Sequence, residues 1–138
     1  MKKVYVFSAA AFFAVNFSLY SQEFDECFDL TSCENSLVSL AIEHGSKYNS
    51  ISRKQQGFSK HLLKMPFDPV SMLMRLIEHE DRGIRNLAAY ILSSKESIAP
   101  EYLPVIERNI DKASWLANSL LAIGTKDAAK VAADVFFK

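Results

Sequence analysis

The sequence predicts an all-α protein of about seven short helices. Apolar residues recur at intervals of three and four positions along most of the chain, which is the spacing of one helix face. Helix-start and helix-stop residues divide these segments, and no convincing alternation of apolar and polar residues indicates a strand. Of the 138 residues, 49% are hydrophobic and 23% are charged, which excludes a disordered chain.

Residues 1–21 are expected to be a secretory signal peptide rather than part of the fold. Lys2 and Lys3 precede an uncharged apolar stretch from Val4 to Leu19, and the small Ser21 follows at a plausible cleavage point. An uncleaved N-terminal anchor is the alternative, although the stretch is shorter than the ~20 apolar residues of a membrane span. We therefore expect an exported protein, periplasmic or secreted, with no membrane span after cleavage.

Cleavage after Ser21 would leave 117 of the 138 residues, with 14 basic side chains against 16 acidic ones. This net-acidic balance argues against nucleic-acid binding. Because an exported chain meets an oxidising compartment, Cys27 and Cys33 are expected to form a disulfide that pins the acidic N-terminal segment, residues 22–32, to the first helix. Two free thiols or half of a metal site are the alternatives, and no second Cys/His pair has zinc-ligand spacing.

The first helix is expected to follow a capping box made by Thr31 and Glu34, and to end before Gly45. Its inward stripe is expected to hold Leu37, Val38, Leu40, Ala41, Ile42 and a partly buried His44. A second helix is expected from about Asn49 to Lys64, ended by the following Met-Pro pair, with His61 solvated between two lysines.

Five further helices with short connections complete the predicted domain, residues 33–138. The residues that start, divide or end them are Asp68-Pro69, Glu80-Asp81, Pro100, residues 111–114, Gly124 and Thr125. Their buried faces are expected to include Leu73, Leu76, Ile84, Leu92, Ile106, Leu116, Leu120, Ala128 and Phe136, with Phe137 exposed.

These helices repeat. Leu73 and Leu103 correspond at an offset of 30 residues, as do Leu76 and Ile106. A helix pair that recurs every ~30 residues indicates a stacked α-solenoid, which we expect to be short.

The segment from Glu80 to Leu92 resembles the second-helix motif of HEAT repeats: acidic residues, an Ile-Arg pair, a pair of small residues and then an aliphatic one. The segment from Leu120 to Ala128 resembles the junction of the short HEAT-like subclass named after phycobilisome lyases. The resemblance covers about residues 68–138. It implies a right-handed solenoid in which Ala88 and Ala89 allow close packing and Arg85 reaches an acidic turn of a neighbouring repeat. Proteins of this kind are mostly binding scaffolds.

The chain shows no catalytic constellation, so we expect neither catalytic nor metal-binding residues, and no cofactor. One cluster, Glu78, His79 and Asp81, superficially resembles a metal site. Successive residues at a helix end point in different directions, which favours a polar turn between helices. A metal-dependent hydrolase that uses this cluster is the alternative of another functional class.

Two surfaces are candidates for binding a partner protein. Residues 45–65 carry five basic and no acidic side chains, whereas residues 22–34 carry five acids and no base. Either these blocks face each other, or the basic helix, through Arg53 and Lys54, recruits an acidic partner. The second surface is the concave row of the solenoid, comprising Arg82, Arg85, Asn86, Tyr90 and Asn118, which Trp115 joins unless it belongs to the core.

These observations predict an exported protein-binding module. The specific expectation is a stoichiometric inhibitor of the immunity type, which neutralises a toxin or an envelope enzyme in the periplasm. A scaffold or adaptor subunit of an envelope complex is the alternative within the binding class.

Overall fold

The computed structural model describes residues 24–44 and 50–137, so the expected signal segment lies outside the described residues. Within these two ranges the chain forms seven α-helices, one 3-10 turn and no strand. The prediction of an all-α fold with seven helices is therefore confirmed for this part of the chain. Among the same residues, no helix has both the length and the apolar character needed to cross a membrane.

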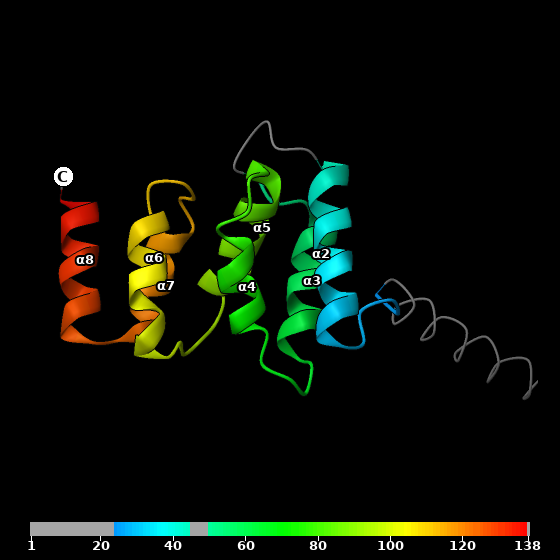
Figure 1. The fold of residues 1–138 in the computed structure, drawn as a ribbon, viewed down its shortest axis with the longest axis horizontal. Coiled ribbons are helices and arrows are strands. Elements are labelled where there is room, and N and C mark those ends of the chain that lie inside the picture. Colours follow the sequence, from blue (N-terminus) through cyan, green and yellow to red (C-terminus); the bar gives the residue numbers. More distant parts are fainter. Residues whose placement is uncertain (1–23, 45–49, 138) are drawn as a thin grey trace, which may run out of the picture.

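The helices stand side by side along the long axis of the molecule, from α2 and α3 at one end to α8 at the other (Figure 1). In chain order they are α2 (Leu30–His44), α3 (Arg53–Leu63), α4 (Val70–Leu76), α5 (Arg82–Ser93), the 3-10 turn η1 (Pro100–Tyr102), α6 (Leu103–Asn109), α7 (Leu116–Ile123) and α8 (Lys126–Phe136).

The core runs along this row of helices. Helix α5 packs against α2 on one side and against α7 on the other, and α7 in turn packs against α8. Helix α4 packs on α5, and α6 packs on α7. Ala88 and Ala89 are fully buried in α5, which agrees with the expectation that small residues let neighbouring helices approach closely. The fully buried large side chains come from most of these helices and include Leu37, Phe58, Leu73, Ile84, Leu87, Ile106, Leu116 and Leu120.

The start of α2 differs from the sequence prediction. The Ser32 N–H donates to Asp29 Oδ1 at 2.7 Å, and the Asp29 N–H donates to Ser32 Oγ at 3.0 Å. This reciprocal pair caps the helix two residues earlier than predicted. The prediction of a capping box made by Thr31 and Glu34 is therefore wrong. The Glu34 carboxylate instead binds the guanidinium of Arg75 on α4.

The other helix ends largely follow the sequence signals. Ser52 and Gln55 form a capping box, so α3 begins a few residues later than expected. Asp81 Oδ1 accepts from the Ile84 N–H at 2.9 Å at the start of α5. Thr125 caps α8 through the Ala128 N–H, and Gly124 before it ends α7 with a positive φ of 69°.

Three expectations about burial are wrong. Ile42 is 63% exposed, His44 is exposed with Nε2 3.1 Å from Ser50 Oγ, and Phe136 is 58% exposed. The physical reason is that α2 and α8 lie at the two ends of the row. Each end helix has fewer neighbours than α5, so its apolar stripe is covered over a narrower arc. Phe137 is 90% exposed, as expected.

Candidate binding surfaces

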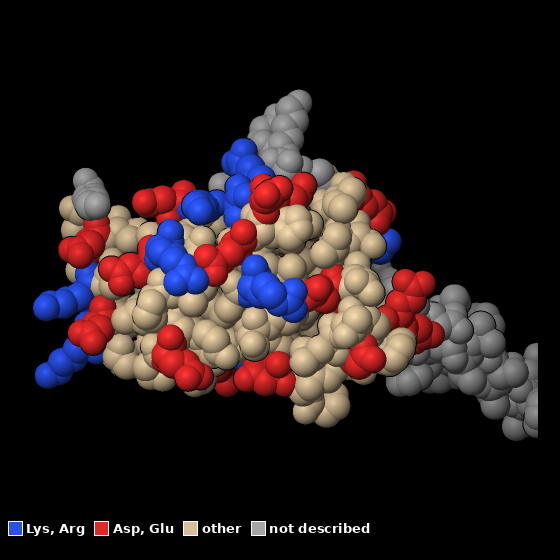
Figure 2. All heavy atoms as spheres, in the orientation of Figure 1, with Lys and Arg blue, Asp and Glu red and all other residues tan. Residues whose placement is uncertain are grey.

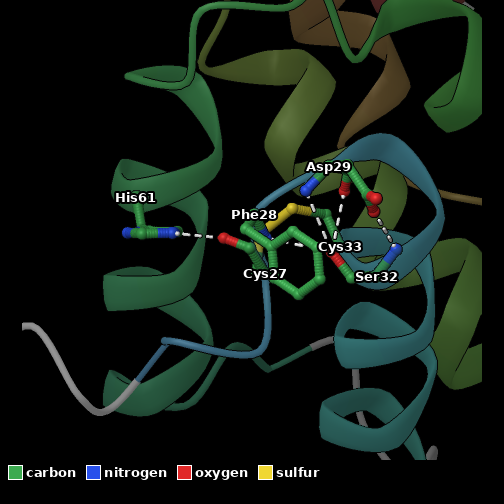
Figure 3. The surroundings of a disulfide bond; sticks show 6 residues. All are labelled: Cys27, Phe28, Asp29, Ser32, Cys33 and His61. Carbon is green, nitrogen blue, oxygen red and sulfur yellow. Dashed lines mark hydrogen bonds between the residues drawn. A yellow bond between two sulfur atoms is a disulfide. The ribbon is translucent and has the colours of Figure 1, made fainter.

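A disulfide closes one end of the row. Cys27 and Cys33 are bonded, with a Cα–Cα distance of 4.1 Å, and both residues are buried (Figure 3). The predicted pairing is confirmed, and it ties the segment before α2 to the second turn of that helix. This pairing leaves neither free thiols nor half of a metal site at these two positions.

His61 joins the same end to α3. Its Nε2 atom lies 3.1 Å from the backbone oxygen of Cys27 (Figure 3). Its ring packs against Phe24 with centroids 5.5 Å apart. Phe24 also packs edge-on against the fully buried Phe58. His61 was expected to be solvated, but it is partly buried, because the disulfide-tied segment folds over its ring.

Arg85 does not reach an acidic turn of a neighbouring repeat. Its guanidinium donates to the backbone oxygens of His79 and Glu80, at 2.9 and 2.7 Å, in the turn that precedes its own helix. Its Nε atom is buried with no hydrogen-bond partner. This side chain therefore closes the α4–α5 turn, which corrects the expected contact with a neighbouring repeat, while its place on a partner-binding surface stays a prediction.

Asn86 also departs from the predicted binding row. The residue is only 7% exposed, and its Nδ2 atom lies 3.5 Å from the Ser50 backbone oxygen in the segment that leads into α3. Its Oδ1 atom is buried without a hydrogen-bond partner. The row is therefore interrupted at this position, because the chain before α3 covers the middle of α5.

The rest of the row remains at the surface. Tyr90 and Trp115 are half-buried and pack edge to face across α5 and α7, with ring centroids 5.1 Å apart. Trp115 Nε1 is buried without a hydrogen-bond partner. Arg82 on α5 and Asn118 on α7 are exposed. Trp115, which the sequence left open between core and surface, thus contributes to both.

The basic and acidic blocks meet only in part. Lys54 pairs with Glu43 of α2 at 3.7 Å, and both line a hollow of about 200 Å³ together with Glu26 of the acidic segment. Arg53 is exposed at the start of α3. Glu34, the last acid of the acidic block, pairs with Arg75 instead. Both interpretations of these blocks therefore retain some support, because Lys54 and Glu26 line the same hollow while Arg53 is exposed.

Glu78, His79 and Asp81 each make contacts that stabilise the fold around the α4–α5 turn. The Glu78 carboxylate receives two hydrogen bonds from Arg108, at 2.7 and 3.0 Å, and these bonds hold its pKa below the usual value. The His79 Nδ1 atom accepts from the Asp81 N–H at 2.9 Å, and the Asp81 carboxylate caps α5. Throughout residues 24–44 and 50–137, no group of three His, Cys, Asp or Glu side chains could hold a metal ion.

Ion pairs that join neighbouring helix hairpins were missed by the sequence analysis. Arg108 of α6 reaches back to Glu78, and Arg75 of α4 reaches back to Glu34 of α2. Basic and acidic atoms accordingly lie close together across the face shown in Figure 2. A signal for the first pair was present in the sequence, since Glu78 and Arg108 are 30 residues apart, which is the spacing of the predicted repeat.

Comparison with known proteins assigns no function to these surfaces. The chain matches no protein-family model, no curated protein and no solved structure.

Proposed function

We propose that this chain is an exported protein-binding module of the HEAT-like type, a short right-handed α-solenoid that neutralises a partner protein by binding it stoichiometrically. The row of helices α2, α5, α7 and α8 supports a repeated stack, as does the ion pair between Glu78 and Arg108 at the repeat spacing. The disulfide between Cys27 and Cys33 supports export, because such bonds persist in oxidising compartments.

The observation that carries this proposal is the aromatic pair on the α5–α7 face. Tyr90 and Trp115 are half-buried, so their rings are held in place by the fold while part of each remains accessible. The exposed Arg82 and Asn118 belong to the same two helices. Rigid aromatic residues together with arginine are the residue types that dominate the binding energy of protein interfaces.

A preorganised surface of this kind suits stoichiometric inhibition of the immunity type. The Tyr90 and Trp115 rings lose little conformational freedom on binding, because their mutual packing already fixes them. The partner is then a toxin or an envelope enzyme whose active surface the complex covers. An adaptor role differs in one observable respect, namely that the bound partner remains active.

The test begins with capture of the partner by the full, disulfide-bonded chain from the envelope fraction of its source cells. The purified partner is then titrated against the wild type and against Tyr90→Ala in a calorimeter. We expect one partner per chain and at least a tenfold weaker dissociation constant for Tyr90→Ala, about 1.4 kcal/mol. Phe136→Ala is the matched control, since Phe136 is an aromatic residue of α8 that is 58% exposed and lies on neither α5 nor α7.

Equal dissociation constants for wild type, Tyr90→Ala and Phe136→Ala would overturn the surface assignment. A folded state of Tyr90→Ala is verified by its circular dichroism, and Asn118→Ala provides a second variant at an exposed position. If the complex forms but the partner keeps its activity, the inhibitor proposal is wrong and the adaptor function takes its place.

A further inference from the structure

The outer face of α3 carries a straight line of positive charge. Arg53, Lys60 and Lys64 follow one another at intervals of seven and four residues, which places them on one side of the helix. All three are exposed, and they lie opposite the buried Phe58 and Leu62. At 1.5 Å per residue, the line spans about 17 Å.

Within residues 24–44 and 50–137, acidic side chains pair with some cations of the fold but with none of this line. Among the residues that the structure describes, the cations held in ion pairs include Lys54, Arg75, Lys95 and Arg108. Helix α3 contains no acidic residue. In the described part of the chain, none of Arg53, Lys60 and Lys64 takes part in an ion pair of 4 Å or less.

The charge at the start of α3 also opposes the stability of the isolated helix. Its first turn holds Arg53 and Lys54 and no acid, although the positive end of the helix dipole favours acidic side chains there. Lys60 and Lys64 near the other end agree with the dipole and need no further explanation. Arg53 is therefore a cation that does not stabilise its own helix, and it lies in line with two others. Binding of a partner molecule would account for such a placement.

We infer that this line, Arg53, Lys60 and Lys64, binds an acidic polypeptide surface of the partner, a row of carboxylates that runs along α3. The inference rests on the proposed function and names the chemistry of the partner. A lipid surface fits less well, because α3 exposes no large apolar side chain to enter a bilayer. Nucleic acid fits less well because the expected mature chain is net acidic.

The experiment uses poly-L-glutamate as a probe of polypeptide carboxylates and measures its binding to the full, oxidised chain by fluorescence anisotropy at low and physiological salt. The test variant combines Arg53→Gln, Lys60→Gln and Lys64→Gln. The matched control combines Lys112→Gln, Lys126→Gln and Lys130→Gln, three exposed cations away from α3. Glutamine keeps a high helix propensity, so both variants should remain folded, which circular dichroism verifies.

We expect the wild type to bind the probe with an affinity that falls as salt rises, the α3 variant to lose at least tenfold, and the control to lose no more than threefold. Equal losses in both variants would overturn the inference, because net charge alone would then explain the binding. Absence of binding by the wild type would also overturn it. So would stronger binding to phosphatidylglycerol vesicles that the α3 variant loses, since α3 would then face a membrane.

Failure of this inference can be distinguished from failure of the proposed function. Tyr90→Ala should leave the binding of poly-L-glutamate unchanged, because Tyr90 lies on the α5–α7 face. If Tyr90→Ala does not weaken the partner complex but the α3 variant loses the probe, the proposed surface is wrong and the basic docking face on α3 stands. If Tyr90→Ala weakens the partner complex but the α3 variant still binds the probe, the docking face on α3 is wrong and the proposed function stands.

Discussion

The guanidinium of Arg85 stabilises the turn between α4 and α5 through its bonds to the backbone oxygens of His79 and Glu80. Arg85→Ala removes both hydrogen bonds, which Nη1 donates, so we expect the free energy of unfolding to fall by about 1–3 kcal/mol. Urea denaturation measures this change. Lys130→Ala, at an exposed position of α8, serves as the control and should change the value by less than about 0.5 kcal/mol. An Arg85→Ala protein that stays as stable as the wild type but no longer binds its partner would show that Arg85 acts at the binding surface rather than in the turn.

Glu78 gives the molecule a defined acid dependence. Hydrogen bonds from Arg108 lower its folded-state pKa, so the unfolded chain takes up a proton at higher pH than the folded chain does. The contribution of Glu78 is therefore complete above the unfolded pKa of about 4.5 and is lost as the pH falls through the lower folded value. The pair is solvent-exposed, so the effect is small and weakens with salt.

Glu78→Gln tests this dependence through urea midpoints between pH 7 and pH 3. We expect the variant to be slightly less stable at pH 7 and the difference to shrink as the pH falls toward 3, because protonation of Glu78 removes its charge pairing with Arg108. A gap between the two proteins that stays constant over the whole range would show that charge pairing with Arg108 does not stabilise the fold. Glu101→Gln, at an exposed position of η1, is the matched control.

The residues of the candidate site were only partly predictable from the sequence. Tyr90 and Asn118 remain at the surface, because their helix faces follow from periodicity alone. The positions of Arg85 and Asn86 depend on where two loops turn their backbone oxygens, which no spacing within α5 encodes. His61 was misjudged for the same reason, since its partner, the Cys27 oxygen, is 34 residues away.

At the scale of the elements, two glycines differ in whether the backbone conformation requires a glycine. Gly124 ends α7 with φ at 69°, where a side chain strains the backbone, although its added Cβ would meet nothing closer than the Leu121 oxygen at 3.9 Å. Gly57 lies inside α3, where a Cβ would make ordinary contact with the Phe24 ring at 3.4 Å. The first glycine is therefore needed for its conformation, and the second weakens its helix.

Thermal and urea unfolding of the two alanine variants should change in opposite directions. Gly124→Ala is expected to lower the free energy of unfolding by about 1–2 kcal/mol, because of backbone strain. Gly57→Ala is expected to raise it by about 0.5–1 kcal/mol, because alanine favours the helix. A loss of stability in Gly57→Ala would mean that Phe24 has no room to accept the new methyl group.

Helix type and number were predictable because each helix has its own apolar stripe and local stop signal. The residues at which the helices start were less predictable. Thr31 and Glu34 match the capping pattern as well as Asp29 and Ser32 do, and the choice between them depends on Glu34 binding Arg75 from another hairpin. The burial of Phe136 likewise depends on which helices surround α8, and local periodicity carries no information about neighbours at the end of a row.

At the scale of the whole molecule, the helices contact mainly their neighbours along the row, and the disulfide lies at one end. Stability in such an arrangement is close to a sum of local and nearest-neighbour terms, so a change at one end should remain near that end. The segment tied by Cys27 and Cys33 contacts α3 through Phe24 and His61. Its loss should therefore weaken α2 and α3 before α7 and α8.

Cys27→Ala combined with Cys33→Ala tests this. Closure of a ring with a sequence separation of six stabilises a protein by about 2 kcal/mol on loop-entropy grounds, and we expect a loss of that size in urea denaturation. Hydrogen exchange followed by mass spectrometry should show faster exchange in α2 and α3, with α7 unchanged. Uniform acceleration in all helices would mean that the row unfolds as one cooperative unit, and the stability of the α5–α7 face would then depend directly on the disulfide.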